Sequence, residues 1–215
     1  MKIEYLGHST FRLTFSNGKT LITDPYTRVG YELPKDLTAD IVTVSHGHFD
    51  HNYTAAIQGK FALADKPQVY TFDGITVRGV ACKHDNQGGT LRGENIAFVI
   101  QADGITLCHM GDIGEEVRVE LIEKLGKIDV LFVPIGGTYT VDYMGAKAYI
   151  DAIQPKLVIP MHYRPKDGII DVSNEKPFLN LYTNVTYAAP KHSAEITRDT
   201  LLEKETDILF MERKS

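Results

Sequence analysis

The sequence contains no tryptophan, only two cysteines and no long apolar run among its 215 residues. No segment approaches the roughly 18 consecutive apolar residues of a membrane-spanning helix, so we expect no contact with a membrane. The N-terminal segment lacks the apolar stretch of a signal peptide. Cys82 and Cys108 are too few for a disulfide framework, and each lies in an apolar, strand-like run. These absences predict a cytoplasmic protein with two reduced, buried thiols.

An excess of positive charge, low-complexity tracts and linker-like segments are also absent from the sequence. The formal net charge is −5, which disfavours a protein that holds nucleic acid on a broad basic face but allows a small substrate that carries phosphate. The 43% hydrophobic content excludes a disordered chain. A chain of this length can bury roughly 70% of its unfolded surface without disulfides. We therefore predict one domain over residues 1–215.

Short apolar runs and glycine-containing turns predict a strand-rich chain. Apolar, β-branched runs over 41–45, 129–134 and 157–159 indicate buried strands. Strands come first and then alternate with helices, which predicts α/β layers with helices over a sheet core. The other expected elements are hairpin turns at Asn17-Gly18, Asp73-Gly74 and Asp103-Gly104, helices over 52–58, 115–125 and 145–153, and a loop over 163–181.

A cluster of histidines carries the clearest chemical signal in the chain. His46, His48, Asp50 and His51 lie within six residues, directly after the strand predicted over 41–45. Imidazole and carboxylate are ligands that divalent transition metals accept, and a loop can turn such side chains toward one point. The alternative is a polar loop that happens to be rich in histidine. The position after a buried strand favours a metal site.

Three further candidate ligands each follow an apolar run: His84, Asp112 and His162. Taken singly, such a residue is more often a turn or capping residue. Open α/β sheets, however, usually build their sites at the carboxyl ends of strands. The shared placement of these three residues and the histidine cluster favours one common metal site.

Two other polar residues follow strands and have two interpretations each. His8 lies in a short turn, where its ring either satisfies local backbone groups or lies near the metals. Asp24 either forms a turn before Pro25 or holds a ligand imidazole in one tautomer. His109 is expected to be a buried, hydrogen-bonded residue of a strand, and His192 a surface residue.

Candidate substrate contacts are less specific. Gly137 belongs to a glycine pair after a strand, where backbone can approach a ligand closely. Tyr139 and Tyr163 could contact substrate, although packing explains both equally well. Lys83 and Arg92 lie near His84 in sequence and could meet an anionic group, but lone basic residues are more often solvated.

The cluster His46-x-His48-x-Asp50-His51, with His84, Gly111-Asp112 and Pro160-Met161-His162-Tyr163, resembles the metallo-β-lactamase superfamily over residues 2–163. The resemblance implies a four-layer αββα sandwich, in which two mixed β-sheets are flanked by helices and the site lies at one edge. The segments most similar to its ascorbate-phosphate-lactonase-like branch are Leu6-Gly7-His8-Ser9-Thr10, Thr23-Asp24-Pro25, Ser45-His46-Gly47-His48 and Pro160-Met161-His162-Tyr163.

The resemblance also implies a site for two divalent metal ions. Zinc is the first expectation, and manganese, nickel, iron or cobalt would accept the same ligands. No cysteine occupies a ligand position, unlike in one major class of β-lactamases. His48 stands where oxygen-reducing di-iron relatives carry glutamate, which disfavours a redox protein. The implied ligands are His46, His48 and His84 for one ion, Asp50, His51 and His162 for the other, and Asp112 as a bridge.

The implied chemistry is hydrolysis. Two such ions can hold a bridging water and lower its pKa from about 15.7 toward about 7, which makes a metal-bridging hydroxide the expected nucleophile. Asp50 would ligate one ion and orient that hydroxide. The resemblance favours His8 as a second catalytic residue, which binds or protonates the leaving group. No serine lies in a Gly-x-Ser-x-Gly elbow, in agreement with this scheme.

The expected substrate is a small, anionic molecule, with a phosphodiester or a sugar-phosphate lactone favoured. One alternative is a non-catalytic metal-binding or regulatory protein on the same fold, which would be expected to have lost ligands. A second alternative is a metal-dependent nuclease, which the acidic charge balance disfavours. The chain carries no other partner signal, although the apolar segment over 208–211 leaves a homo-oligomer open.

Overall fold

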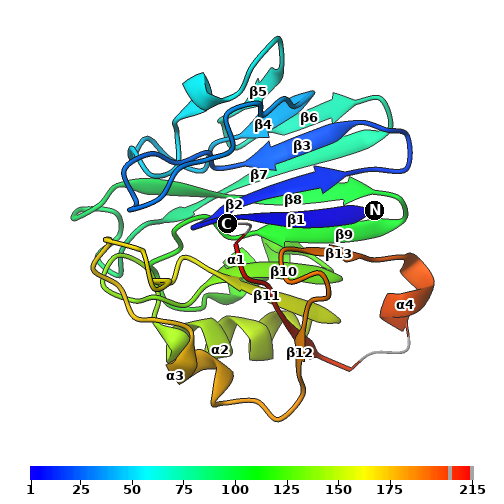
Figure 1. The fold of residues 1–215 in the computed structure, drawn as a ribbon. Helices are drawn as coiled ribbons and strands as arrows, with labels where there is room; N and C mark the ends of the chain where they lie inside the picture. The colour runs from blue at the N-terminus through cyan, green and yellow to red at the C-terminus, as the bar shows by residue number, and fades with distance from the viewer. Residues whose placement is uncertain (203–204, 214–215) are drawn as a thin grey trace.

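Two β-sheets packed face to face form the centre of the molecule (Figure 1). The computed structural model describes residues 1–202 and 205–213. The six-stranded sheet has the order β13-β1-β2-β3-β4-β5, and the eight-stranded sheet has the order β12-β14-β11-β10-β9-β8-β7-β6. The strands are β1 (Lys2–Gly7), β2 (Thr10–Thr14), β3 (Thr20–Thr23), β4 (Ile41–Thr43), β5 (Ala62–Ala64), β6 (Val69–Phe72), β7 (Ile75–Lys83), β8 (Glu94–Ala102), β9 (Ile105–His109), β10 (Val130–Pro134), β11 (Leu157–Met161), β12 (Val185–Tyr187), β13 (Ser193–Glu195) and β14 (Asp207–Phe210).

Both sheets are mixed, as the resemblance implied. Neighbouring strands β1, β2 and β3 pair antiparallel, whereas β3, β4 and β5 pair parallel. In the other sheet β6 to β9 form an antiparallel meander, and β9, β10, β11 and β14 pair parallel. The predicted hairpin turns are present, and Asp73, Gly74, Asp103 and Gly104 all have positive φ, as type I′ turns require.

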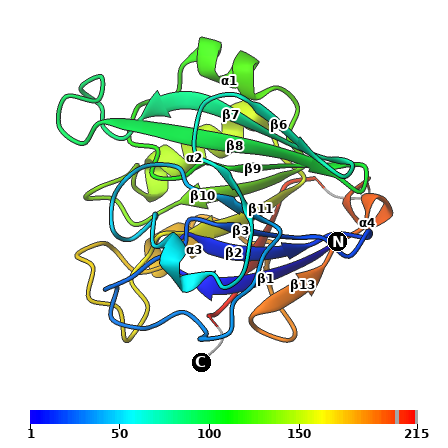
Figure 2. The same ribbon diagram turned by 90° about the horizontal axis from the view of Figure 1, so that it is seen from above.

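Helices α1 (Val119–Leu125) and α2 (Tyr143–Ile153) lie against the outer face of the eight-stranded sheet (Figure 2). Short helices α3 (Lys176–Leu179) and α4 (Arg198–Leu202) come later in the chain. Helix α2 begins two residues earlier than predicted, because Asp142 caps it by accepting from the backbone N–H groups of Met144 and Gly145. The helix predicted over 115–125 begins at Val119, and α3 interrupts the predicted loop over 163–181.

The helix predicted over 52–58 is wrong. Only a single 3₁₀ turn, η1 (Thr54–Ala56), forms there. The Asn52 side chain donates to the Gly47 carbonyl instead of capping a helix. The backbone N–H groups of Tyr53 and Gln58 donate to the carbonyls of Pro25 and Leu37, which lie in another loop. Because these backbone N–H groups already donate to another loop, they are not available for helical hydrogen bonds, and the segment does not continue as a helix.

Apolar side chains fill both faces of the smaller sheet. Successive side chains of a strand point to opposite faces of the sheet, so the neighbours Leu21 and Ile22 belong to two different clusters. The large cluster lies between the two sheets and beneath the helices, and it contains Cys82 and Cys108 as free, buried thiols, as predicted. The smaller cluster is covered by Leu37 and Ile57 from loop segments, so this outer layer is thin and contains few helical residues. Over the described residues, none of the helices combines the length and apolar character needed to span a bilayer.

Candidate metal centre

The loop after β4 brings its three histidines to one edge of the sandwich. Two backbone hydrogen bonds close this loop: the N–H groups of His51 and Asn52 both donate to the His48 carbonyl. His84 directly follows β7, and His162 directly follows β11. Loops from both sheets therefore meet at this edge, on the left in Figure 1.

One group of candidate ligands consists of His46, His48 and His84. One nitrogen of each ring lies within 4.8 Å of the others, and His48 Nδ1 lies 3.2 Å from His84 Nε2. These three residues come from two loops that are far apart in sequence. The structure thus brings together the set that the resemblance implied for one ion.

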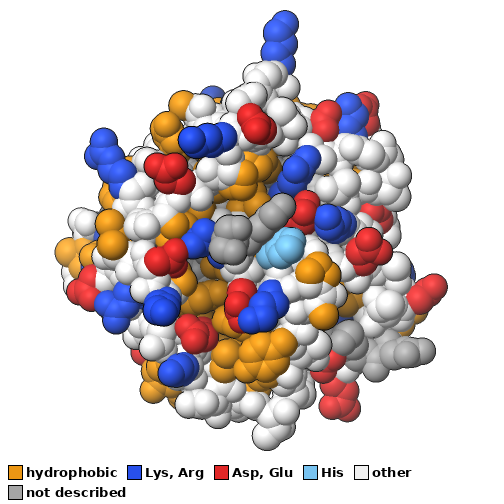
Figure 3. Space-filling model, viewed as in Figure 1, with side chains coloured by type: hydrophobic (Ala, Val, Ile, Leu, Met, Phe, Trp, Pro, Cys, Tyr) orange, Lys and Arg blue, Asp and Glu red, His pale blue; other side chains and the backbone are white. Residues whose placement is uncertain are grey.

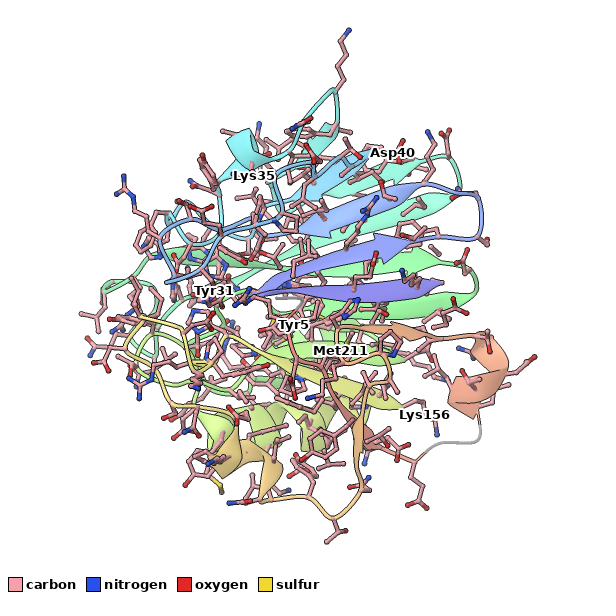
Figure 4. All side chains as sticks on the ribbon, viewed as in Figure 1. Tyr5, Tyr31, Lys35, Asp40, Lys156 and Met211 are labelled. Carbon is pink, nitrogen blue, oxygen red and sulfur yellow. The ribbon has the colours of Figure 1, made fainter. Side chains whose placement is uncertain are left out.

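The second group contains Asp50, His51 and His162, and also His8, with all ligand atoms again within 4.8 Å of one another. The ring of His8 is buried, and its Nε2 lies 3.2 Å from Asp50 Oδ2. Its backbone has a φ of 54°, and its N–H donates to the Tyr31 hydroxyl at 3.1 Å. Figure 4 shows Tyr31 at the end of β1, where His8 lies.

Asp112 lies between the two groups. Its Oδ1 is 3.1 Å from His51 Nε2, and its Oδ2 is 3.2 Å from His162 Nε2 and 3.5 Å from His84 Nε2. The backbone N–H of Asp112 donates to Asn95 Oδ1 at 2.9 Å, which fixes its position. One carboxylate therefore reaches both groups, which is the arrangement expected of a bridge.

Gly111 allows the chain to turn into this position. Its φ is +54°, and a Cβ there would collide with the side chains of Asn95 and Ser45. Any other residue would displace either the strand end or the carboxylate that follows it. The Gly-Asp pair therefore acts as a unit, in which the glycine permits the backbone path and Asp112 supplies the charge.

The protonation of the cluster suits metal binding. Burial and the nearby His51 lower the pKa of His46 to about 3, and burial with His162 lowers the pKa of His8 to about 4. Burial raises the pKa of Asp112, but His162 and His51 lower it more, and the net shift is well below its usual range. His51 differs: burial lowers its pKa, but the nearby Asp112 and Asp24 raise it more, to well above its usual range, so a bound cation would have to displace a proton from this ring. The neutral imidazoles of His46 and His8 and the ionised carboxylate of Asp112 are already in the forms that bind a divalent cation.

Several buried polar atoms of the cluster make no hydrogen bond within the described residues. They include His46 Nε2, His51 Nε2, Asp112 Oδ1 and both ring nitrogens of His162. Buried polar atoms are costly unless they are paired or coordinate a metal. The donor set therefore fits one or more divalent metal ions.

Asp24 holds the cluster from behind. It is fully buried; its Oδ2 lies 2.8 Å from His51 Nδ1 and accepts from Ser45 Oγ at 2.5 Å. Burial raises the pKa of Asp24, but the hydrogen bond with His51 and the nearby His109 lower it more. An ionised Asp24 accepts the proton of His51 Nδ1, so His51 Nε2, which lies 3.1 Å from Asp112 Oδ1, is the nitrogen that would bind a metal. Sequence reasoning missed the contact of Ser45 Oγ with His46 Nδ1 at 2.9 Å.

Replacing Asp24 with asparagine should weaken metal binding by about 10- to 100-fold, because the amide can no longer fix the tautomer of His51. Titration against a chromophoric chelator measures this affinity. Asp40→Asn is the matched control, since Asp40 accepts hydrogen bonds from Thr20 and lies at the opposite end of the sheet from Tyr31 (Figure 4). Equal affinity in Asp24→Asn and wild type would contradict the positioning role.

The two candidate ligand groups open into a cavity of about 480 Å³. Most of its remaining wall is apolar, and Arg92 and Asp171 supply charge. This volume is within the range of small-molecule sites. The lining residues are His48, Phe49, Asp50, His84, Arg92, Asp112, Tyr139, Ile169, Ile170 and Asp171.

Of the three residues predicted to contact substrate, only one lines the cavity. Tyr139 lines the cavity, as the substrate hypothesis requires. Gly137 does not line it, but its φ of +67° permits the turn that carries Tyr139. For Tyr163 the packing alternative is confirmed and the substrate contact is wrong, because its side chain is buried, does not line this cavity and donates its hydroxyl to the Met211 carbonyl at 3.0 Å.

The two remaining histidines and the two basic residues near His84 differ in burial and in their contacts. His109 is buried, with Nε2 at 2.8 Å from the Ser9 carbonyl, as predicted. His192 is half-buried, less exposed than the surface position predicted for it. Lys83 pairs with Glu94 and does not line the cavity, whereas Arg92 does.

Known proteins resemble this chain in sequence and in structure. The Beta-lactamase superfamily domain matches residues 2–162. A UPF0173 metal-dependent hydrolase of Carboxydothermus hydrogenoformans is 31% identical over 192 residues, which cover 76% of this chain and 84% of that protein. One from Pelotomaculum thermopropionicum is 33% identical over 195 residues, with the same coverage. A solved structure from Thermotoga maritima, described as a member of the metallo-β-lactamase superfamily, is 35% identical, has a TM-score of 0.80 and matches 99% of both chains.

Proposed function

This chain belongs to the metallo-β-lactamase superfamily and is a metal-dependent hydrolase, and we propose that it cleaves small anionic substrates, with phosphodiesters and sugar-phosphate lactones first. The superfamily and the two mixed sheets predicted from sequence are thereby confirmed. The lactonase-like branch stays a prediction. The observation that carries the proposal is the cavity of about 480 Å³, because candidate ligands from both groups line it.

The proposed centre holds two divalent ions. His46, His48 and His84 would bind one ion, Asp50, His51 and His162 the other, and Asp112 would contact both. Zinc is the first choice, in line with the Thermotoga maritima protein, which is described as a candidate zinc-dependent hydrolase. Imidazole and carboxylate donors also accept manganese, nickel, iron or cobalt. When bound, such ions lower the pKa of water and polarise the scissile bond.

The chain supplies its own proton acceptor. Asp50 lines the cavity and is held by His8 at 3.2 Å, so its carboxylate can accept a hydrogen bond from the attacking water. His8 contacts Asp50 and is not among the residues that line the cavity. Its role in this proposal is therefore to orient Asp50, which differs from the leaving-group role expected from the sequence.

The two alternatives fit the structure less well. A binding or regulatory protein would not need seven candidate ligands, five of which have buried donor atoms without a hydrogen bond in the described structure. A nuclease would need a basic surface for the phosphate backbone. On the face shown in Figure 3, Lys and Arg side chains alternate with Asp and Glu and form no broad basic area.

A panel of phosphodiester, lactone, thioester and β-lactam substrates tests the proposal, with each substrate assayed after loading with zinc and with manganese. We expect kcat/KM for a phosphodiester or a sugar-phosphate lactone to exceed that for the other classes by about 10-fold or more, a difference of about 1.4 kcal/mol in barrier. Chelator-treated protein provides the blank. Turnover of thioesters or β-lactams alone would overturn the substrate assignment.

A further inference from the structure

Arg92 occupies an unusual position for a basic residue near a metal site. It is half-buried and lines the cavity. Its guanidinium carbon lies 5.6 Å from the centroid of the Tyr139 ring, on the same cavity wall. Among the described residues, no carboxylate lies within ion-pair distance of its guanidinium, although Asp171 lines the same cavity and lies 3.8 Å from Arg164.

The loop that carries Arg92 is fixed from inside by one carboxylate. Asp85 is buried, and its Oδ1 accepts from the backbone N–H groups of Gln87 and Gly89, both at 2.8 Å. Its Oδ2 accepts from the N–H groups of Leu91 at 2.9 Å and Arg92 at 2.7 Å. Each carboxylate oxygen thus restrains a different part of the loop, and the last bond anchors the backbone of Arg92 itself.

The base of this loop is closed as well. The His84 N–H donates to the Gly93 carbonyl at 3.1 Å, and the Gly93 N–H donates to the Gly89 carbonyl at 2.9 Å. His84 is a candidate metal ligand, so the same closed loop presents a ligand at one end and Arg92 at the other. The spacing between the metal cluster and the guanidinium is therefore built into one restrained segment.

We propose that Arg92 binds an anionic group of the substrate other than the bond that is cleaved, and that Asp85 is the residue that positions it. The cation lies on a cavity wall above the Tyr139 ring and has no acidic partner among the described residues, so its N–H donors are available to a bidentate oxyanion. A carboxylate and a phosphate share this chemistry. The exposed side chains of Phe49 and Ile169, also in the cavity wall, would contact an apolar part between the two ends.

The inference rests on the proposed function for its kinetic test. Three 4-nitrophenyl phosphodiesters form the series, with ethyl, carboxyethyl or phosphoethyl as the second ester group. We expect wild type to prefer at least one anionic arm over ethyl by about 10-fold or more in kcat/KM, mainly through KM, because a hydrogen-bonded charge pair contributes that much to binding. In Arg92→Met the preference should fall to near unity. A preference that survives in Arg92→Met would overturn the proposal.

Two further variants separate positioning from general damage. Asp85→Asn retains one carbonyl acceptor and should reduce the preference about 3- to 10-fold through KM, with kcat and bound metal close to wild type. Arg118→Met removes an arginine that pairs with Glu115 outside the cavity, and it should behave as wild type. A fall in kcat without a change in preference in Asp85→Asn would show a merely structural role.

A binding measurement keeps the inference testable if phosphodiesters are not hydrolysed. Phenyl phosphate and 3-phenylpropanoate are titrated calorimetrically into metal-loaded wild type and Arg92→Met. A Kd raised about 10-fold or more in the variant for either ligand supports the anion site even where the substrate assignment has failed. Equal affinities of both proteins for both ligands would overturn it. The two ligands also distinguish a phosphate from a carboxylate preference.

Discussion

Replacing Asp112 with asparagine should lower kcat/KM by about 10³-fold, because several kcal/mol of transition-state stabilisation depend on the metals it would hold. Its two oxygens lie within 3.5 Å of the rings of His51, His162 and His84. No other carboxylate among the described residues reaches both candidate ligand groups at such distances. The amide keeps the shape of the side chain but removes its charge and one anionic donor, so both ions should bind more weakly.

The measurement combines kinetics with metal content by atomic emission. Wild type should contain about two ions per chain, and Asp112→Asn fewer. Asp151→Asn is a suitable control, since this exposed carboxylate on α2 pairs only with Lys147 in the described structure, and it should change neither quantity. An Asp112→Asn protein that kept two ions and activity within 10-fold of wild type would refute the bridging role.

Removing the metals should abolish hydrolysis and lower Tm by about 8–16 °C. A ligand that binds only the native state at 1,000 times its Kd stabilises it by about 4.1 kcal/mol, and each kcal/mol shifts Tm by about 2–4 °C in a chain of this size. The physical cause is that the ring nitrogens of His162 and Oδ1 of Asp112 are buried and make no hydrogen bond within the described residues when no metal is bound.

Calorimetric scans of chelator-treated and reloaded protein test this expectation, with zinc and manganese loaded separately. His48→Ala provides a comparison, because His48 is exposed and its loss should leave the fold intact while it weakens one ligand group. In this variant the shift of Tm upon loading should be smaller and turnover should be lost. An unchanged Tm after complete removal of metal, or full activity of His48→Ala, would contradict the proposed centre.

Local sequence determined the elements and part of the site. Continuous apolar, β-branched runs indicated the buried strands. Asp73-Gly74 and Asp103-Gly104 indicated hairpins, because the backbone of such pairs tolerates positive φ. The sequence also predicted the ligand cluster from His46 to His51, because these candidate ligands lie within one loop. Where the backbone of a segment bonds to another loop, as at Tyr53, the prediction of a helix was wrong.

Only the tertiary structure decided the contacts within the site and which residues line its cavity. It brought Asp112 to within 3.2 Å of His162, placed His8 against Asp50, and turned Tyr163 into the core while Arg92 came to line the cavity. The sequence determines the chemistry of each side chain and much of the local backbone conformation. The meeting of strand ends depends on how two sheets pack and on which loops cover them, and those contacts join residues far apart in the chain.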